Sequence, residues 1–122
     1  MPGKKKPKVL VVDDERVIAD TLAIILNQHG YDASAVYTGI GAVERARQLS
    51  PDLIISDVIM PDMNGIEAAI RIRDFLPSCK ILLFSGQAAT ADLLENARLQ
   101  GHEFEILAKP VHPQDLLAKL RS

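Results

Sequence analysis

Apolar runs and helical patterns alternate along the whole chain. Four short runs are mostly apolar: Val9–Val12, Leu53–Ser56, Ile81–Phe84 and Phe104–Leu107. A weaker run, Ala33–Val36, is typical of an edge strand. Because a strand that is apolar on both sides must be covered on both faces, these runs predict buried parallel strands joined by crossover helices.

Helical spacing separates the runs. Ile18, Leu22, Ile25 and Leu26 predict a first helix, which Gly30 ends. Further helices are expected at about 39–49, from 66 to just before Pro77, at about 90–100, and from Pro113 onward. Strands alternating with helices predict a doubly wound α/β fold, in which a five-stranded parallel sheet lies between two helical layers.

Composition adds a few limits. The 122 residues fit one domain, expected at 8–122 behind a basic, flexible tail at 1–7. A formal net charge of −2 argues against direct nucleic-acid binding. The single Cys79 predicts a packed, inert thiol. No apolar run is long enough to cross a membrane, so we expect a cytoplasmic protein without a membrane partner.

Polar side chains stand at the carboxyl ends of the predicted strands, where an open parallel sheet binds its ligands. They are Asp13 and Asp14 after the first strand, Asp57 after the third, Ser85 and Gly86 after the fourth, and Lys109 after the fifth. Each has an ordinary structural explanation when taken alone, such as a helix N-cap for Asp14. Their meeting at one edge of the sheet favours a common site.

Three carboxylates placed together repel one another and need a cation to neutralise them. Oxygen ligands with room for water suit Mg²⁺, whereas the scattered His29, His102 and His112 do not suggest zinc. A metal and Lys109 would make a positive pocket around one carboxylate. Such a carboxylate could attack phosphorus and form an acyl phosphate.

Four segments together resemble the receiver domains of bacterial two-component response regulators. They are Val9–Asp14, the loop Asp57–Gly65, Phe84–Gly86 and Lys109–Pro110. The resemblance extends from about Lys8 to Leu120 and implies a flavodoxin-like strand order of 2-1-3-4-5. It also implies a signalling phosphoacceptor rather than an enzyme. Such a phosphoacceptor catalyses its own phosphoryl uptake and dephosphorylation.

By this resemblance, Asp57 accepts a phosphoryl group from a sensor histidine kinase or a phosphotransfer protein. Asp14 and Asp57 would bind Mg²⁺, together with the backbone carbonyl of Ile59 and with Asp13 acting partly through water.

The resemblance also implies which groups surround the phosphoryl group. Lys109 would hold a phosphate oxygen, Ser85 would hydrogen-bond the phosphoryl group and draw its loop inward, and the small Gly86 would leave the phosphate approachable. Lys109–Pro110 is expected to be a cis peptide.

Two positions depart from the family's pattern. An aromatic residue is usual three residues before the lysine, where this chain has Ile106. In the family this aromatic side chain turns inward when the serine moves. Here we expect Phe104, on the same strand face, or a reshaped contact of Ile106 to carry this switch. The remaining alternative is that the serine is only weakly coupled to the output face. His112 replaces a common acidic or small polar N-cap, which weakens the start of the last helix slightly.

Several interpretations stay open. The chain could be a stand-alone receiver that binds an effector through its fourth helix, fifth strand and fifth helix, or the N-terminal receiver of a larger regulator. A degenerate scaffold receiver is a third case. A haloacid-dehalogenase-type phosphatase would need an Asp-x-Asp pair where the chain has Asp13–Asp14, and a flavin-binding module would not place two acids in its phosphate loop.

Overall fold

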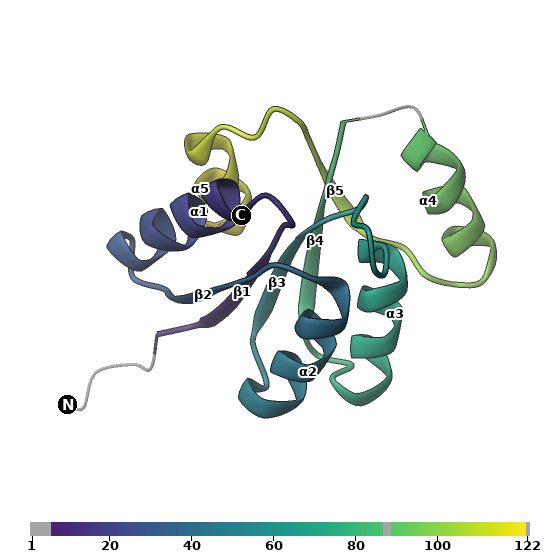
Figure 1. The fold of residues 1–122 in the computed structure, drawn as a ribbon, viewed down its shortest axis with the longest axis horizontal. Helices are drawn as coiled ribbons and strands as arrows, with labels where there is room; N and C mark the ends of the chain where they lie inside the picture. Colours follow the sequence, from purple (N-terminus) through teal and green to yellow (C-terminus); the bar gives the residue numbers. More distant parts are fainter. Residues whose placement is uncertain (1–5, 87–88, 122) are drawn as a thin grey trace.

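The computed structural model describes residues 6–86 and 89–121. Its centre is a parallel sheet of five strands, β1 (Lys8–Val12), β2 (Asp32–Val36), β3 (Leu53–Asp57), β4 (Lys80–Ser85) and β5 (Glu105–Ala108) (Figure 1). The helices between and after them are α1 (Arg16–Gln28), α2 (Gly39–Leu49), α3 (Gly65–Phe75), α4 (Ala89–Leu99) and α5 (Pro113–Arg121). The strand order is β2-β1-β3-β4-β5, which confirms the predicted fold.

Helices cover the sheet on both faces (Figure 1). Successive side chains of β1 point to opposite faces, so Val9 and Val11 pack with α1 and α5, whereas Leu10 and Val12 pack with α2 and α3. The central strands are buried on both faces, as their continuous apolar sequence predicts. Their rigidity positions every side chain that follows them.

Most predicted boundaries are confirmed to within one residue. In β5 the shift of one residue changes where Phe104 lies. β5 pairs with β4 from Glu105, opposite Leu82, to Ala108, one residue later than expected. Phe104 therefore lies before the strand, where its ring packs under the Arg73 guanidinium at 4.2 Å. The apolar run shows that Phe104 is partly buried, but it does not show where backbone pairing begins.

Glycines follow two helices, and the stop at Gly30 is as predicted. Gly30 and Gly101 follow α1 and α4 with φ of 94° and 93°, a backbone conformation that glycine adopts without strain. Cys79 is buried, and burial raises the pKa of its thiol to about 11, which agrees with an inert packed thiol.

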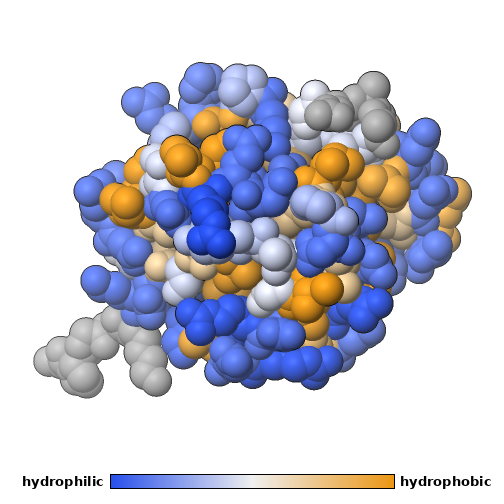
Figure 2. Space-filling model, viewed as in Figure 1, coloured by the Kyte–Doolittle hydropathy of each residue, from blue (hydrophilic) through white to orange (hydrophobic). Residues whose placement is uncertain are grey.

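The described surface is mostly polar. Figure 2 shows hydrophilic residues over much of one face, interrupted by separate apolar patches. Within residues 6–86 and 89–121, no helix has the length and apolar character required to span a membrane. Residues 1–5 of the expected basic tail lie outside the described residues, while Lys6 and Pro7 are exposed.

Candidate functional site

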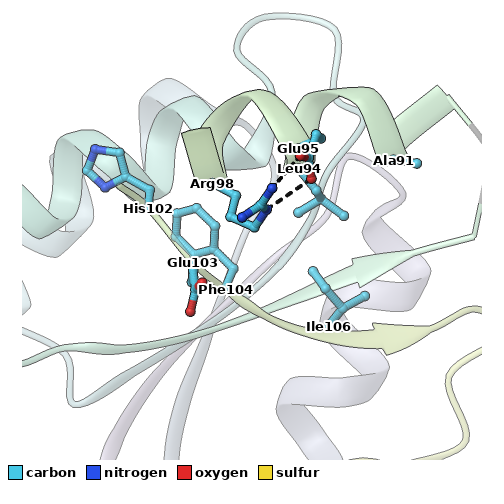
Figure 3. A pocket seen from close by; sticks show the side chains of 8 residues that line it. All are labelled: Ala91, Leu94, Glu95, Arg98, His102, Glu103, Phe104 and Ile106. Carbon is cyan, nitrogen blue, oxygen red and sulfur yellow. Dashed lines mark hydrogen bonds and ion pairs between the residues drawn. The ribbon is translucent and has the colours of Figure 1, made fainter. Parts of the chain in front are cut away.

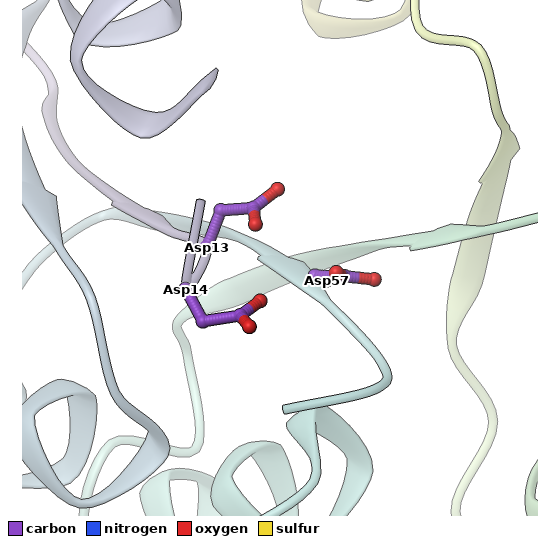
Figure 4. A group of neighbouring side chains, drawn as sticks. All are labelled: Asp13, Asp14 and Asp57. Carbon is purple, nitrogen blue, oxygen red and sulfur yellow. The ribbon is translucent and has the colours of Figure 1, made fainter. Parts of the chain in front are cut away.

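Three carboxylates meet at the carboxyl edge of the sheet. Parallel pairing of β1 with β3 sets Val12 beside Ser56, so the residues that follow these two also become neighbours. One carboxylate oxygen from each of Asp13, Asp14 and Asp57 lies within 4.8 Å of the others (Figure 4). Asp13 and Asp57 are buried, whereas Asp14 is exposed. The predicted acidic cluster is therefore brought together.

Asp13 carries an electrostatic cost in the cluster. Its Oδ1 accepts a hydrogen bond of 2.9 Å from the Glu15 backbone N–H, but its buried Oδ2 has no hydrogen-bond partner among the described residues. The pKa of Asp13 is raised to about 6, chiefly by burial and also by neighbouring Asp57 and Asp14, while the Glu15 N–H and the positive charge of Lys109 act to lower it. A buried carboxylate oxygen without a partner, in a set of hard oxygen donors, fits a divalent cation such as Mg²⁺.

Lys109 supplies the positive side of the site. Its Nζ lies 2.9 Å from Asp57 Oδ2, and its backbone N–H donates to the Ser85 carbonyl at 3.1 Å, which ties the β5–α5 loop to β4. A Cβ on Gly86 would stand 2.7 Å from Lys109 Cβ. The structure thus gives a second reason for glycine at position 86, which is that the missing side chain leaves room for the aliphatic part of Lys109. The expected Lys109–Pro110 cis peptide is present.

The backbone after Asp57 is held from two sides. The Gly65 N–H donates to the Val58 carbonyl at 2.7 Å, and the Ser56 hydroxyl donates to the Asp57 carbonyl at 2.9 Å. A Cβ on Gly65 would stand only 2.0 Å from that same carbonyl oxygen. Ile59, whose carbonyl is an expected metal ligand, has a side chain that is 44% exposed in this loop. The close approach at Gly65 fixes the start of the loop.

Asp62 joins the same loop to α2, a contact that the sequence reasoning missed. Its carboxylate accepts hydrogen bonds from the backbone N–H groups of Gly39 at 3.1 Å and Ile40 at 2.8 Å. Burial alone would raise the pKa of Asp62, but the N–H groups of Ile40, Gly39 and Met63 hold it below its usual value. A Cβ on Gly39 would stand 2.5 Å from the Met63 carbonyl oxygen, so this glycine permits the close contact.

Ser85 has a partner that the sequence reasoning also missed. Its hydroxyl hydrogen-bonds the hydroxyl of Thr90, which is buried near the start of α4. Phe104 and Ile106, the two expected switch residues, lie together in a groove of about 420 Å³ between α4 and β5, which Leu94 and Arg98 also line (Figure 3). No pattern in the sequence predicts a contact between Ser85 and Thr90, because a serine and a threonine five residues apart do not indicate any particular structure.

Comparisons with known proteins agree with this arrangement. The family model described as "response regulator receiver domain" matches residues 9–121. The probable transcriptional regulatory protein TcrX of Mycobacterium tuberculosis is 30% identical over 114 residues, 93% of this chain and 48% of that protein. The DNA-binding response regulator MtrA of Mycobacterium leprae is 30% identical over 117 residues, 96% of this chain and 51% of that protein. The chain thus spans about half the length of these curated relatives.

Solved structures show the same fold. The chemotaxis protein CheY4 of Vibrio cholerae superimposes with a TM-score of 0.84 at 30% identity, covering 95% of this chain and 97% of that one. A CheY-like receiver domain protein from Methanospirillum hungatei gives a TM-score of 0.85 at 27% identity, covering 95% of this chain and 91% of that one.

Proposed function

Because this chain belongs to the family of response regulator receiver domains of two-component systems, we propose that it is a phosphoacceptor that takes a phosphoryl group on Asp57 and signals by phosphorylation-dependent protein contact. The observation that carries the proposal is the placing of Asp57 between two acidic neighbours and the Lys109 ammonium, 2.9 Å away. No other described cluster of three metal-ligating side chains competes with it.

The acidic cluster supports a Mg²⁺ site, which is general for this family. Asp13, Asp14 and Asp57 would hold the ion, with the Ile59 carbonyl as a further ligand. When bound, Mg²⁺ supplies positive charge that offsets the charge of the phosphoryl oxygens during transfer. The buried Asp13 Oδ2, which has no hydrogen-bond partner among the described residues, favours binding of Mg²⁺, since a cation offsets the cost of burying a carboxylate.

The transfer itself needs little beyond positioning. A carboxylate oxygen of Asp57 forms the bond to phosphorus as the phosphorus–nitrogen bond of a phosphohistidine breaks, and the imidazole leaves. Lys109 moves from its ion pair with Asp57 to a phosphoryl oxygen, and Ser85 donates its hydroxyl to another. These roles make the chain a signalling protein with self-catalysed uptake and loss of phosphate, rather than a metabolic enzyme.

A groove beside the site supports docking of the phosphodonor, a histidine kinase or phosphotransfer protein. The groove has a volume of about 710 Å³ and lies between α1 and the segment from β5 to α5. Its lining includes Asp13 and Lys109 of the site, together with Pro113 and with Val17, which is 78% exposed. A donor seated there would bring its phosphohistidine to Asp57.

Output is proposed to use the face made by α4, β5 and α5. Arg98 is exposed on α4, and its Nε–H donates a hydrogen bond of 3.0 Å to the Glu95 carboxylate. Arg98→Glu should weaken binding of the effector while leaving phosphorylation of Asp57 unchanged, and equal binding by both forms would remove this face from the proposal. Since the DNA-binding relatives are twice as long, an effector domain joined to this receiver is the second candidate.

Intact-mass spectrometry tests the phosphoacceptor proposal. The protein is incubated with acetyl phosphate and Mg²⁺, and compared with Asp57→Asn and with Asp74→Asn, an exposed carboxylate on α3. We expect one phosphoryl adduct on the wild type and on Asp74→Asn, and none on Asp57→Asn or without Mg²⁺. Absence of any adduct, together with failure to bind Mg²⁺, would favour the scaffold receiver instead.

A further inference from the structure

The hydroxyl pair of Ser85 and Thr90 connects the end of β4 to the beginning of α4. Ser85 is half-buried at the edge of the site, two positions beyond the fully buried Leu83, and Thr90 is only 2% exposed. A buried hydroxyl needs a hydrogen-bond partner, because leaving it without one costs the hydration it has lost. The pair therefore satisfies Thr90 and fixes the direction of the Ser85 hydroxyl at the same time.

Thr90 also anchors α4. Among the α4 side chains that the structure describes, only Thr90 and Ala97 are buried. They are seven residues apart, which places them two turns apart on one face of the helix. Leu93 and Leu94 between them are half-buried against the core. The N-terminal turn of α4 thus depends on Thr90 for its attachment to the sheet.

The opposite side of α4 offers no polar partner for Ser85. Ile106 on β5 has a purely apolar side chain, half-buried against the core. The Phe104 ring is already covered by the Arg73 guanidinium at 4.2 Å. Neither side chain can accept or donate a hydrogen bond when Ser85 moves, whereas Thr90 on α4 already hydrogen-bonds Ser85.

We propose that Thr90 is a positioning residue of the phosphoryl site, whose hydroxyl holds Ser85 toward α4 in the unphosphorylated protein and is released when Ser85 turns to the phosphoryl group. This inference rests on the proposed function of Asp57. It assigns to a helix residue a hydrogen-bonded coupling, which the apolar Ile106 side chain cannot form.

The energetic argument is a competition between two partners for the Ser85 hydroxyl, in a pair where either hydroxyl can be the donor. A hydrogen bond from Ser85 to a charged phosphoryl oxygen is roughly twice as strong as one between two neutral hydroxyls. Phosphorylation therefore draws Ser85 away from Thr90. Release of the pair removes one link between Ser85 and the first turn of α4, so a change of charge at Asp57 reaches this helix.

Thr90→Val tests the proposal because valine keeps the branched shape and removes the hydroxyl. Thr90→Ser is the matched control that keeps the hydroxyl. Without the restraint, Ser85 reaches the phosphoryl site more often, so Thr90→Val should take up phosphate from acetyl phosphate about three- to tenfold faster, the equilibrium effect of one net hydrogen bond. Thr90→Ser should behave like the wild type. Unchanged or slower uptake by Thr90→Val would overturn the proposal.

A double-mutant cycle separates this role from a loss of packing in α4. In the Ser85→Ala background the hydroxyl pair is already absent, so adding Thr90→Val should leave the uptake rate unchanged. An equal acceleration in both backgrounds would mean that Thr90 acts by another route, and the proposal would fall. Backbone amide NMR gives a second readout, in which the α4 signals of unphosphorylated Thr90→Val should move toward their positions in the phosphorylated wild type.

Failure of the inference can be told from failure of the proposed function. If the wild type takes no phosphoryl group, the function proposed for Asp57 is wrong and the cycle has no signal to report. If the wild type is phosphorylated but Thr90→Val matches it in rate and in NMR spectrum, the phosphoacceptor stands and only the role of Thr90 is rejected.

Discussion

The two halves of the sheet differ in how firmly they are held. In β1 and β3, which carry the acidic cluster, every residue is buried except Lys8 at the start of β1. In β5, at the far edge, no residue is buried, and α4 beside it buries only Thr90 and Ala97 among its described side chains. The carboxylates thus stand on rigid strands, whereas the proposed output face is built from lightly packed elements.

This difference suits a signalling domain. The site proposed to hold Asp57, Lys109 and a cation in fixed geometry is best placed on strands locked by packing. The face proposed to change after phosphorylation is best placed where few apolar contacts have to be broken, since such segments open at the lowest free energy. Matched substitutions in the two regions test this contrast.

The largest effect is expected from a single methyl group at Gly65. Gly65→Ala places its Cβ 2.0 Å from the Asp57 carbonyl oxygen, a backbone atom that cannot move without disturbing the site. We expect a loss of more than about 3 kcal/mol in the free energy of unfolding, at the upper end of overpacking effects. Gly101→Ala, after α4, meets no atom within 4 Å and should cost about 1 kcal/mol, from its positive φ alone.

Urea unfolding followed by circular dichroism measures both variants. Equal losses at Gly65 and Gly101 would contradict the view that the site loop is packed more tightly than the end of α4.

Removal of apolar side chains should show the same contrast. Ile55→Ala in β3 removes a fully buried side chain and should cost about 3–4 kcal/mol, because a cavity remains between packed layers. Ile106→Ala in β5 removes a half-buried side chain at an edge and should cost about 1 kcal/mol. Native-state hydrogen exchange would sharpen the result, with β5 amides exchanging faster than β3 amides in the wild type. A larger loss at Ile106 would reverse the comparison.

Asp13→Asn should stabilise the metal-free protein. The pKa of Asp13 is raised to about 6 from an ordinary 3.8, so its ionised form is disfavoured in the folded state and weakens it at neutral pH. We expect a gain of about 1–3 kcal/mol at pH 7.5 without Mg²⁺. The gain should shrink as the pH falls through 6 toward 4, because the wild-type carboxyl then becomes protonated and its penalty disappears.

Asp13→Asn should also lower the affinity of the protein for Mg²⁺. Isothermal titration with Mg²⁺ should show weaker binding by Asp13→Asn, and thermal unfolding with and without Mg²⁺ should show a smaller ion-induced increase in Tm than in the wild type. If Asp13→Asn were less stable than the wild type at pH 7.5 without Mg²⁺, the electrostatic cost assigned to Asp13 would be wrong.

A smaller effect is expected from Asp62, which fastens the site loop to α2. Asp62→Ala removes the acceptor of the Gly39 and Ile40 N–H groups and should cost about 1 kcal/mol, as loss of a helix cap does. Asp62→Asn keeps an oxygen acceptor and should lose less. Since the pKa of Asp62 is lowered, its contribution is present above an ordinary carboxyl pKa and is lost as the pH falls below that range.

Mg²⁺ affinity gives Asp62 its second readout. If the carboxylate positions the loop that carries Ile59, Asp62→Ala should weaken Mg²⁺ binding more than Asp62→Asn does. Identical affinities for the two variants and the wild type would limit Asp62 to capping α2.

The sequence predicted the fold and the five polar site positions because both follow from strand periodicity. Once the apolar runs are parallel strands, Asp13, Asp57 and Lys109 must share an edge, and the structure places them together. The resemblance to a family added the strand order and the cis peptide, which the structure confirms. The roles of these residues toward phosphate and Mg²⁺ stay predictions.

The missed contacts are those that no local pattern records. Asp62 reaches amides 22 and 23 residues earlier in the chain, and only the folded approach of the two segments reveals it. Gly86 is predicted to leave the phosphate approachable, which stays a prediction, but the sequence did not show that a Cβ there would meet the Lys109 stem. Thr90 looked like an ordinary polar residue at the start of a helix, because its burial depends on how α4 lies against the sheet. Such contacts arise from tertiary distance rather than from spacing.

The position of β1 in the sheet also has a consequence for how the chain folds. β1 is the first strand in the sequence, yet it pairs with both β2 and β3. During synthesis, the edge of β1 that pairs with β3 stays unpaired until β3 is made, more than forty residues later. Pairing across such a separation is slow, because the loop must close before contacts repay its lost entropy. The acidic cluster cannot assemble until that pairing is made, so a nascent chain lacks this cluster before about half of the domain is in place.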